Sequence, residues 1–80
     1  MPKESSKPVE NVTSARELLA LNMLRLRREY GWSQEILALE AGLDRTFIAH
    51  VERHKRNISI DNIERLARAL DVAISELFAG

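Results

Sequence analysis

Several features are missing from this sequence, and each absence excludes a class of protein. The chain contains no cysteine, which excludes disulfides and cysteine-based zinc or thiol chemistry and suits a reducing, cytoplasmic environment. No apolar run approaches the roughly 20 residues that a membrane span requires. No acid–base constellation, metal-ligand cluster or phosphate-binding loop can be recognised, so we expect no enzyme, metal, cofactor or small-molecule ligand.

An excess of charge of either sign is also missing, because 12 Lys and Arg residues balance 12 Asp and Glu residues. This balance argues mildly against nucleic-acid binding, since such domains are often strongly basic. The charges are unevenly distributed, however. Arginines cluster at residues 25–28 and, with a lysine, at residues 45–56, whereas acidic residues outnumber basic ones after Asn57. A basic middle beside an acidic end produces the oriented field that a DNA-docking face needs.

The length of 80 residues suffices for one domain and not for two. Residues 1–13 carry Pro2, Pro8, serines and mixed charge without an apolar core region, so they predict a disordered N-terminal arm rather than a signal peptide. Residues 14–80 remain for a single domain. A domain this small buries a modest core, which predicts marginal stability or the help of a partner subunit.

Helix-capping residues divide this domain into helical segments. Ser14 with Glu17 has the form of a capping box, and Ser33, Asp44 and Ser59 each precede an apolar-periodic segment. An apolar residue before each of these three caps is matched by another five residues later, which is the spacing of a hydrophobic staple. The sequence therefore predicts an all-α fold of five helices, at residues 15–30, 34–41, 45–53, 60–70 and 74–78.

The apolar faces of these helices predict the core. Leucines 18, 21 and 24 exceed what one core stripe needs and indicate either edge packing or a subunit contact. The expected core comprises Leu19, Met23, Leu26, Leu37, Ala38, Ala41, Leu43, Ile48, Val51, Ile60, Ile63, Leu66, Ala67, Leu70, Val72, Leu77 and Phe78.

Residues 34–53 are the most informative segment. Two short helices are joined there by only Gly42, Leu43 and Asp44, and so brief a link forces a steep crossing rather than an antiparallel hairpin. Gly42 can adopt the left-handed conformation that ends a helix. This arrangement holds the second of the two helices away from the body, where its first residues can enter a DNA major groove.

Residues 20–78 closely resemble the lambda-repressor-like (Cro-type, XRE) family of helix-turn-helix domains. The resemblance rests on GWSQEILALEAGLDRTFIAHVERHKRN followed by SIDNIERLARALDVAISELF. It implies a five-helix, lambda-repressor-like DNA-binding domain. Within the family, LDRTFIAHVERHKRNISI looks most like the controller proteins of restriction-modification systems. The matching positions include Arg27, Gly31, Ser33, Gln34, Leu37, Ala38, Gly42, Ile48, Glu52, Arg53, Leu66, Ala67, Leu70, Leu77 and Phe78.

The resemblance also implies a role for individual residues. Arg45, Thr46 and His50 match positions that face base edges, with Phe47 beside them, and Ala49 shares their helical face. Arg45 can donate two parallel hydrogen bonds to guanine, and Phe47 can either contact a thymine methyl or pack at the core edge. Arg27 and Glu52 match an ion pair between helices. Phosphate contacts are expected from Ser33, Gln34, Arg53, Lys55, Arg56 and Asn57.

Some positions depart from the family pattern or invite another interpretation. His54 stands where the family usually has glycine, so a positive φ there would be strained, and Ile58 stands where proline is common. His50 and His54 have the spacing of a helical zinc pair, but further ligands are missing and His54 falls at the helix end. Ser33 is expected to be a cap and not a nucleophile, because nothing is placed to activate it.

These observations predict a sequence-specific prokaryotic transcriptional regulator that binds a palindromic operator as a homodimer. One domain reads only a few base pairs, so two domains at adjacent half-sites are needed for specificity. The dimer contact is expected around Ile74, Leu77 and Phe78. The alternative is an antitoxin-like or protein-interaction module of the same fold, which zero net charge and the additional leucines favour.

Overall fold

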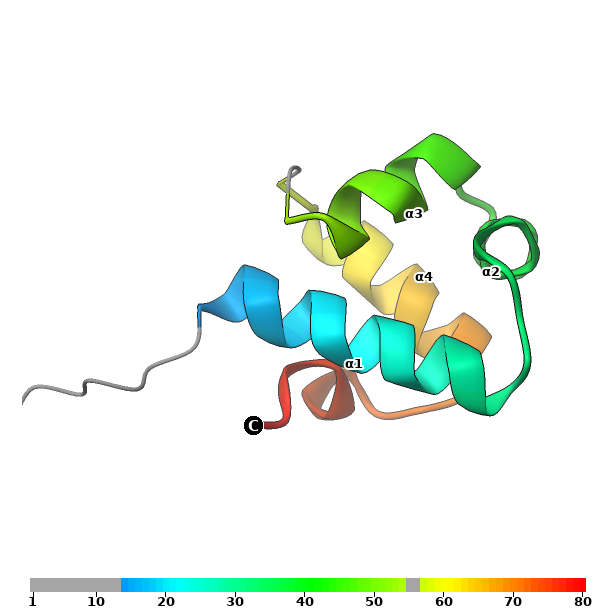
Figure 1. Cartoon of the computed structure of the whole chain (residues 1–80). Helices are drawn as coiled ribbons and strands as arrows, with labels where there is room; N and C mark the ends of the chain where they lie inside the picture. Colours follow the sequence, from blue (N-terminus) through cyan, green and yellow to red (C-terminus); the bar gives the residue numbers. More distant parts are fainter. Residues whose placement is uncertain (1–13, 55–56) are drawn as a thin grey trace, which may run out of the picture.

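The computed structural model describes residues 14–54 and 57–80, which form four α-helices, one 3₁₀ helix and no strand (Figure 1). The all-α prediction is confirmed for these residues. The elements are α1 (Ala15–Glu29), α2 (Gln34–Ala41), α3 (Arg45–Glu52), α4 (Ile60–Leu70) and the 3₁₀ helix η1 (Ile74–Phe78). No described helix is long and apolar enough to cross a membrane. The predicted N-terminal arm lies outside the described residues.

The fifth helix lies at the predicted residues 74–78, but it is a 3₁₀ helix, so the count of five α-helices is not confirmed. The Glu76 amide donates to the Ala73 carbonyl at 2.9 Å and the Ala79 amide to the Glu76 carbonyl at 3.4 Å, which is the i→i+3 pattern of that helix type. Ala73 supplies no side-chain cap. Five residues without a cap are too few to sustain an α-helical hydrogen-bond ladder.

The predicted caps fix where the four α-helices begin. Ser14 and Glu17 form a reciprocal capping box, with both side-chain-to-backbone hydrogen bonds at 3.1 Å. Ser33, Asp44 and Ser59 each accept a hydrogen bond from a first-turn amide at 3.0 to 3.1 Å. Each bond satisfies one of the amides that a helix start leaves without an intrahelical partner.

A left-handed residue follows each of the four α-helices, beginning with Gly31 after α1 at φ 72°. Gly42 has φ 70° and ends α2, as predicted, while the Leu43 amide donates to the Ala38 carbonyl at 2.8 Å. His54 and Asp71 follow α3 and α4 with φ 62° and 57°. The strain expected at His54 is therefore present, since a side chain in this conformation costs free energy that glycine avoids.

The core lies where α1, α2, α3, α4 and η1 meet, and it matches the predicted set with one exception. The assignment of Ile60 to the core is wrong, because its side chain is 79% exposed. Ile60 is the first residue of α4, one turn before Ile63, which is itself only partly buried. The core therefore ends before Ile60 is reached. The fully buried large side chains are Leu19, Met23, Leu37, Ile48, Leu66, Leu70 and Leu77.

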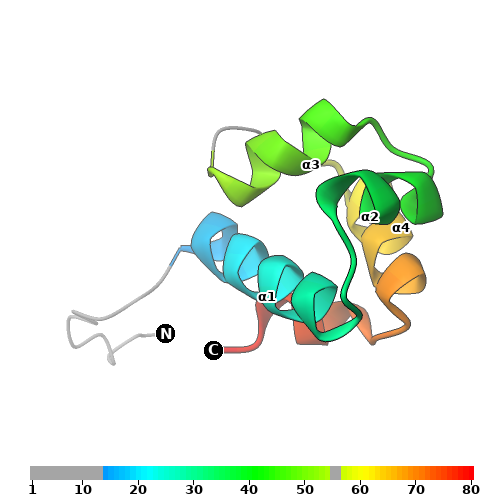
Figure 2. The same ribbon diagram turned by 45° about the vertical axis from the view of Figure 1, so that its right-hand side comes forward.

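A buried polar residue that the sequence analysis missed joins the two ends of the fold. The side-chain amide of Asn22, in α1, lies 3.1 Å from the Leu77 carbonyl and 2.9 Å from the Ala79 carbonyl. The Tyr30 hydroxyl, at the end of α1, donates to the Leu70 carbonyl at 2.7 Å. The Asn22 bonds hold η1 beside α1, as Figures 1 and 2 show, and the Tyr30 bond ties the end of α4 to the end of α1.

Candidate nucleic-acid interface

Helix α3 has one buried and one exposed side. Ile48 and Val51 are buried against α1 and α2, which anchors the helix from behind. Arg45 and Thr46 follow the turn at Gly42 directly and are exposed. Ile48 and Val51 share one face of α3, so Thr46 lies on the opposite, outward face and Arg45 lies at its flank, where both side chains are exposed.

The other predicted base-facing residues are less exposed. Ala49 and His50 are partly buried, and Phe47 is partly buried against the core. Of the two interpretations of Phe47, packing at the core edge is therefore present in the structure. The described residues contain no cluster of three metal-binding side chains around His50 or elsewhere.

A groove of about 580 Å³ between α1, α2 and α3 brings seven of the predicted site residues together. It is lined by residues from the second half of α1, the start of α2 and the outward side of α3. Two lining residues, Leu24 and Arg28, were missed as site residues. Their helical position could have identified them, because residues 24, 27 and 28 lie on one face of α1. The full lining is Leu24, Arg27, Arg28, Gln34, Arg45, Thr46, Ala49, Glu52 and Arg53.

A hydrogen-bonded ion pair forms the floor of this groove. Arg27 Nε lies 2.8 Å from Glu52 Oε2, and Arg27 Nη2 lies 3.1 Å from Glu52 Oε1. The two side chains are only 13% and 9% exposed. Arg27 Nη1 also donates to the Trp32 carbonyl at 2.9 Å, and Gln34 Nε2 donates to Glu52 Oε1 at 2.8 Å. This network fixes α3 and the start of α2 relative to α1.

The start of α2 has hydrogen-bond donors in addition to those already paired within the protein. An amide nitrogen carries two hydrogens, so Gln34 has a second donor besides the one directed at Glu52. Ser33 is exposed, and its hydroxyl oxygen accepts from the Ile36 amide. The backbone amides of the first turn carry the positive end of the helix dipole, which favours an anion.

The segment after α3 carries the remaining predicted phosphate contacts. Arg53 is exposed, and its Nε lies 3.4 Å from the Ala49 carbonyl. Asn57 is exposed, and its Oδ1 accepts a hydrogen bond from Arg16 Nη2 at the start of α1. Lys55 and Arg56 lie outside the described residues.

The predicted dimer contact requires one correction. Leu77 is fully buried within the monomer, so its side chain has no surface to offer a partner subunit. It supports η1 from behind instead. Ile74 is 47% exposed and Phe78 is partly buried, which leaves these two residues as contact candidates.

Comparison with known proteins agrees with this geometry. A model of the helix-turn-helix family matches residues 23–77. The chain belongs to the helix-turn-helix family. The resemblance noted in the sequence is thereby confirmed, and relatives include controller proteins of restriction-modification systems.

Three similar proteins illustrate the range. The Neisseria hypothetical transcription factor from Neisseria meningitidis serogroup B is 52% identical over 78% of this chain. The matched region spans 58% of that relative's length. The controller protein C.AhdI from Aeromonas hydrophila is 44% identical with a TM-score of 0.76, covering 79% of this chain and 96% of that one. C.Esp1396I bound to a 25 base pair operator site is 31% identical with a TM-score of 0.73, covering 84% and 88%.

Proposed function

We propose that this protein is a sequence-specific transcriptional regulator that binds operator DNA in the cytoplasm and controls restriction-modification genes. One observation carries the proposal: Arg45 and Thr46 are exposed at the outward start of α3, while Ile48 and Val51 hold that helix rigidly on the core. A preorganised helix with exposed donors at its start can enter the major groove without paying an ordering cost. The similarity to an operator-bound controller protein supports this function.

Base recognition is assigned to the outward side of α3. Arg45 has no ion pair among the described residues, so its guanidinium can meet guanine O6 and N7 without first breaking a bond. Thr46 and His50 supply single polar contacts. Partly buried Ala49 presents no long side chain and permits close approach to the bases.

Phosphate recognition is assigned to the two flanks of α3. On one flank, Gln34, Ser33 and the first-turn amides of α2 bind a backbone phosphate. On the other flank, Arg53, Lys55, Arg56 and Asn57 lie along the DNA backbone. Two flanking groups of phosphate contacts set the orientation in which α3 enters the groove, although they carry no sequence information themselves.

The protein acts as a homodimer, because one copy of α3 reads too few base pairs to identify a site in a genome. Two copies related by a twofold axis read half-sites about one helical turn apart, which makes the operator palindromic. Exposed Ile74 and the accessible part of Phe78 supply the dimer contact around η1.

Selection of bound duplexes from a random DNA pool tests this function. The expected result is an enriched palindrome whose half-site centres lie about 10 base pairs apart. Arg45→Ala protein should enrich sequences that are degenerate at one position in each half-site. Recovery of unenriched DNA by the wild-type protein would overturn the proposal.

A second candidate function is protein recognition by the same fold. The observation that favours it is the exposure of large apolar side chains outside the α3 face, with Leu39 and Ile60 each 79% exposed and Leu21 59% exposed. Retention on random DNA at low salt, lost as salt rises, would discriminate the two functions. A module that binds only protein should pass through the DNA column at low salt without being retained.

A further inference from the structure

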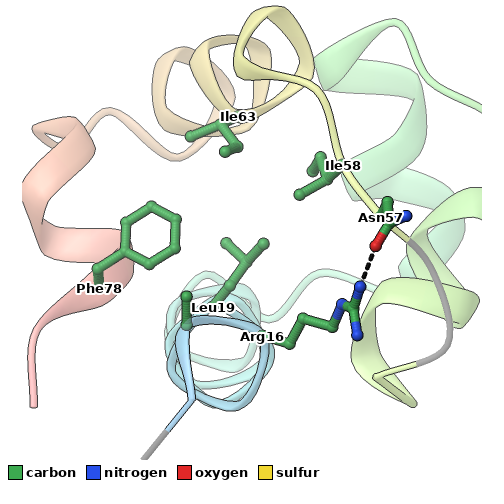
Figure 3. Close-up of a pocket in the computed structure, with 7 residues that line it drawn as sticks. Arg16, Leu19, Asn57, Ile58, Ile63 and Phe78 are labelled. Atoms are coloured by element: carbon green, nitrogen blue, oxygen red, sulfur yellow. Dashed lines mark hydrogen bonds between the residues drawn. The ribbon is translucent and has the colours of Figure 1, made fainter.

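A hollow of about 360 Å³ lies beneath the segment that joins α3 to α4 (Figure 3). Its walls come from the first turns of α1, from the joining segment, from α4 and from η1. Leu19, Ile58, Ile63 and Phe78 face it with apolar side chains, and Arg16 and Asn57 stand at its rim. Asn57 and Ile58 therefore lie partly over an opening rather than on close-packed side chains.

A single side-chain hydrogen bond closes the rim on this side. Arg16 Nη2 donates to Asn57 Oδ1 across 41 residues of sequence, and both side chains are exposed. None of the three ion pairs among the described residues involves Arg16, so no carboxylate of these residues competes for its guanidinium. Close packing beneath Asn57 is reduced by the hollow, so the position of Asn57 depends more strongly on this contact.

The contact also fixes which way the Asn57 amide faces. Its oxygen is occupied by the Arg16 donor, so its nitrogen, which carries two hydrogens, is directed elsewhere. An amide nitrogen can donate to a phosphate, whereas the amide oxygen would repel one. Without Arg16, the amide could turn by about 180° and present the wrong atom at nearly the same position.

We propose that Arg16 is a positioning residue for DNA binding, which holds Asn57 so that its amide nitrogen donates to the DNA backbone. The inference rests on the proposed function, because it assigns a role within the same interface. It extends the DNA-binding machinery to the first turn of α1, which the sequence analysis did not include. Arg16 acts through Asn57 and not through its own charge.

A double-mutant cycle measures this role. Affinities for the selected operator, or for a random duplex at low salt, are compared for wild type, Arg16→Ala, Asn57→Ala and the double variant. Loss of a hydrogen bond of this kind weakens an interaction by roughly two- to tenfold. We expect Arg16→Ala to weaken binding by that factor in the wild-type background and to have no further effect when Asn57 is alanine.

Two further measurements separate positioning from simpler roles. The slope of log affinity against log salt concentration should change no more in Arg16→Ala than it changes in Asn57→Ala. Thermal unfolding should be close to that of wild type, because the contact is exposed. Arg68→Ala is the matched control, since it removes an exposed arginine that pairs with Glu64 on α4, and its affinity should equal that of wild type.

Each other outcome overturns the inference. An Arg16→Ala effect that persists in the Asn57→Ala background, with a salt slope reduced by about 0.9, would make Arg16 a direct phosphate contact. Equal affinity of Arg16→Ala and wild type would remove Arg16 from the interface altogether. Both results leave the proposed function intact, whereas failure of the wild-type protein to bind any DNA would defeat the proposed function instead.

Discussion

Truncation of Glu52 should be among the most destabilising single changes to a polar residue of this domain. Glu52 is 9% exposed and accepts from Arg27 and Gln34, so Glu52→Ala leaves a largely buried guanidinium and an amide without their acceptor. Breaking a buried ion pair from one side costs about 3–5 kcal/mol. Arg27 keeps its bond to the Trp32 carbonyl, which favours the lower end of that range.

Urea unfolding followed by circular dichroism measures this cost. For a domain of this size, the free energy of unfolding falls by about 1 kcal/mol per molar urea, so Glu52→Ala should lower the midpoint by roughly 3 M. Glu52→Gln is the matched variant, because it preserves shape and an acceptor oxygen, and its loss should be about half as large. Arg27→Met combined with Glu52→Leu should recover most of the stability, since it removes both charges together.

Two results would refute this reasoning. A loss below about 1 kcal/mol in Glu52→Ala would place the pair among solvated surface pairs, despite its low exposure. If the double variant loses as much free energy of unfolding as the two single variants lose together, Arg27 and Glu52 do not act on each other. Either result would also remove this pair from the interactions that fix α3 on α1.

Three further predictions concern other parts of the molecule. Arg45→Ala should reduce discrimination between operator and random DNA by about 1–3 kcal/mol in gel-shift titrations, and an equal loss on both would discredit Arg45 as a base reader. Asn22→Leu should lower the free energy of unfolding by about 1–3 kcal/mol, because the carbonyls of Leu77 and Ala79 lose their donor, and unchanged urea unfolding would contradict this role. His54→Gly should raise the melting temperature by about 2–4 °C, since relief of left-handed strain exceeds the added entropy of the unfolded chain by about 0.5 kcal/mol. His54→Val is its control and should be less stable than wild type, so a melting temperature ordered otherwise would contradict the strain argument.

The helix boundaries could be predicted from sequence because their causes are local. Ser33, Asp44 and Ser59 bond to amides only two or three residues away, and Gly42 ends α2 through its own backbone freedom. Such signals do not depend on the rest of the fold. The helix-turn-helix follows directly, since two correctly placed helices and a three-residue link leave little freedom in their crossing.

The errors arose where the environment comes from distant parts of the chain. Asn22 is buried only because the carbonyls of Leu77 and Ala79 arrive 55 and 57 residues later to meet it. Leu77 was expected both in the core and at the dimer contact, and apolar character alone does not distinguish the two, but its full burial confirms only the core assignment. Ile60 continued the stripe of α4, but periodicity does not reveal where the neighbouring helices stop.

The zero net charge of the chain does not oppose DNA binding once the arginines are located. Arg25 pairs with Glu29 at 3.1 Å and Arg68 with Glu64 at 3.6 Å, so these acidic residues offset cations away from the start of α3. Arg28, Arg45 and Arg53 are exposed around one groove and take part in none of the ion pairs among the described residues. DNA responds to the local potential within about a Debye length of its phosphates, which is about 10 Å at moderate salt. The arrangement of the arginines, and not the sum of all charges, therefore sets the local potential at this face of the domain.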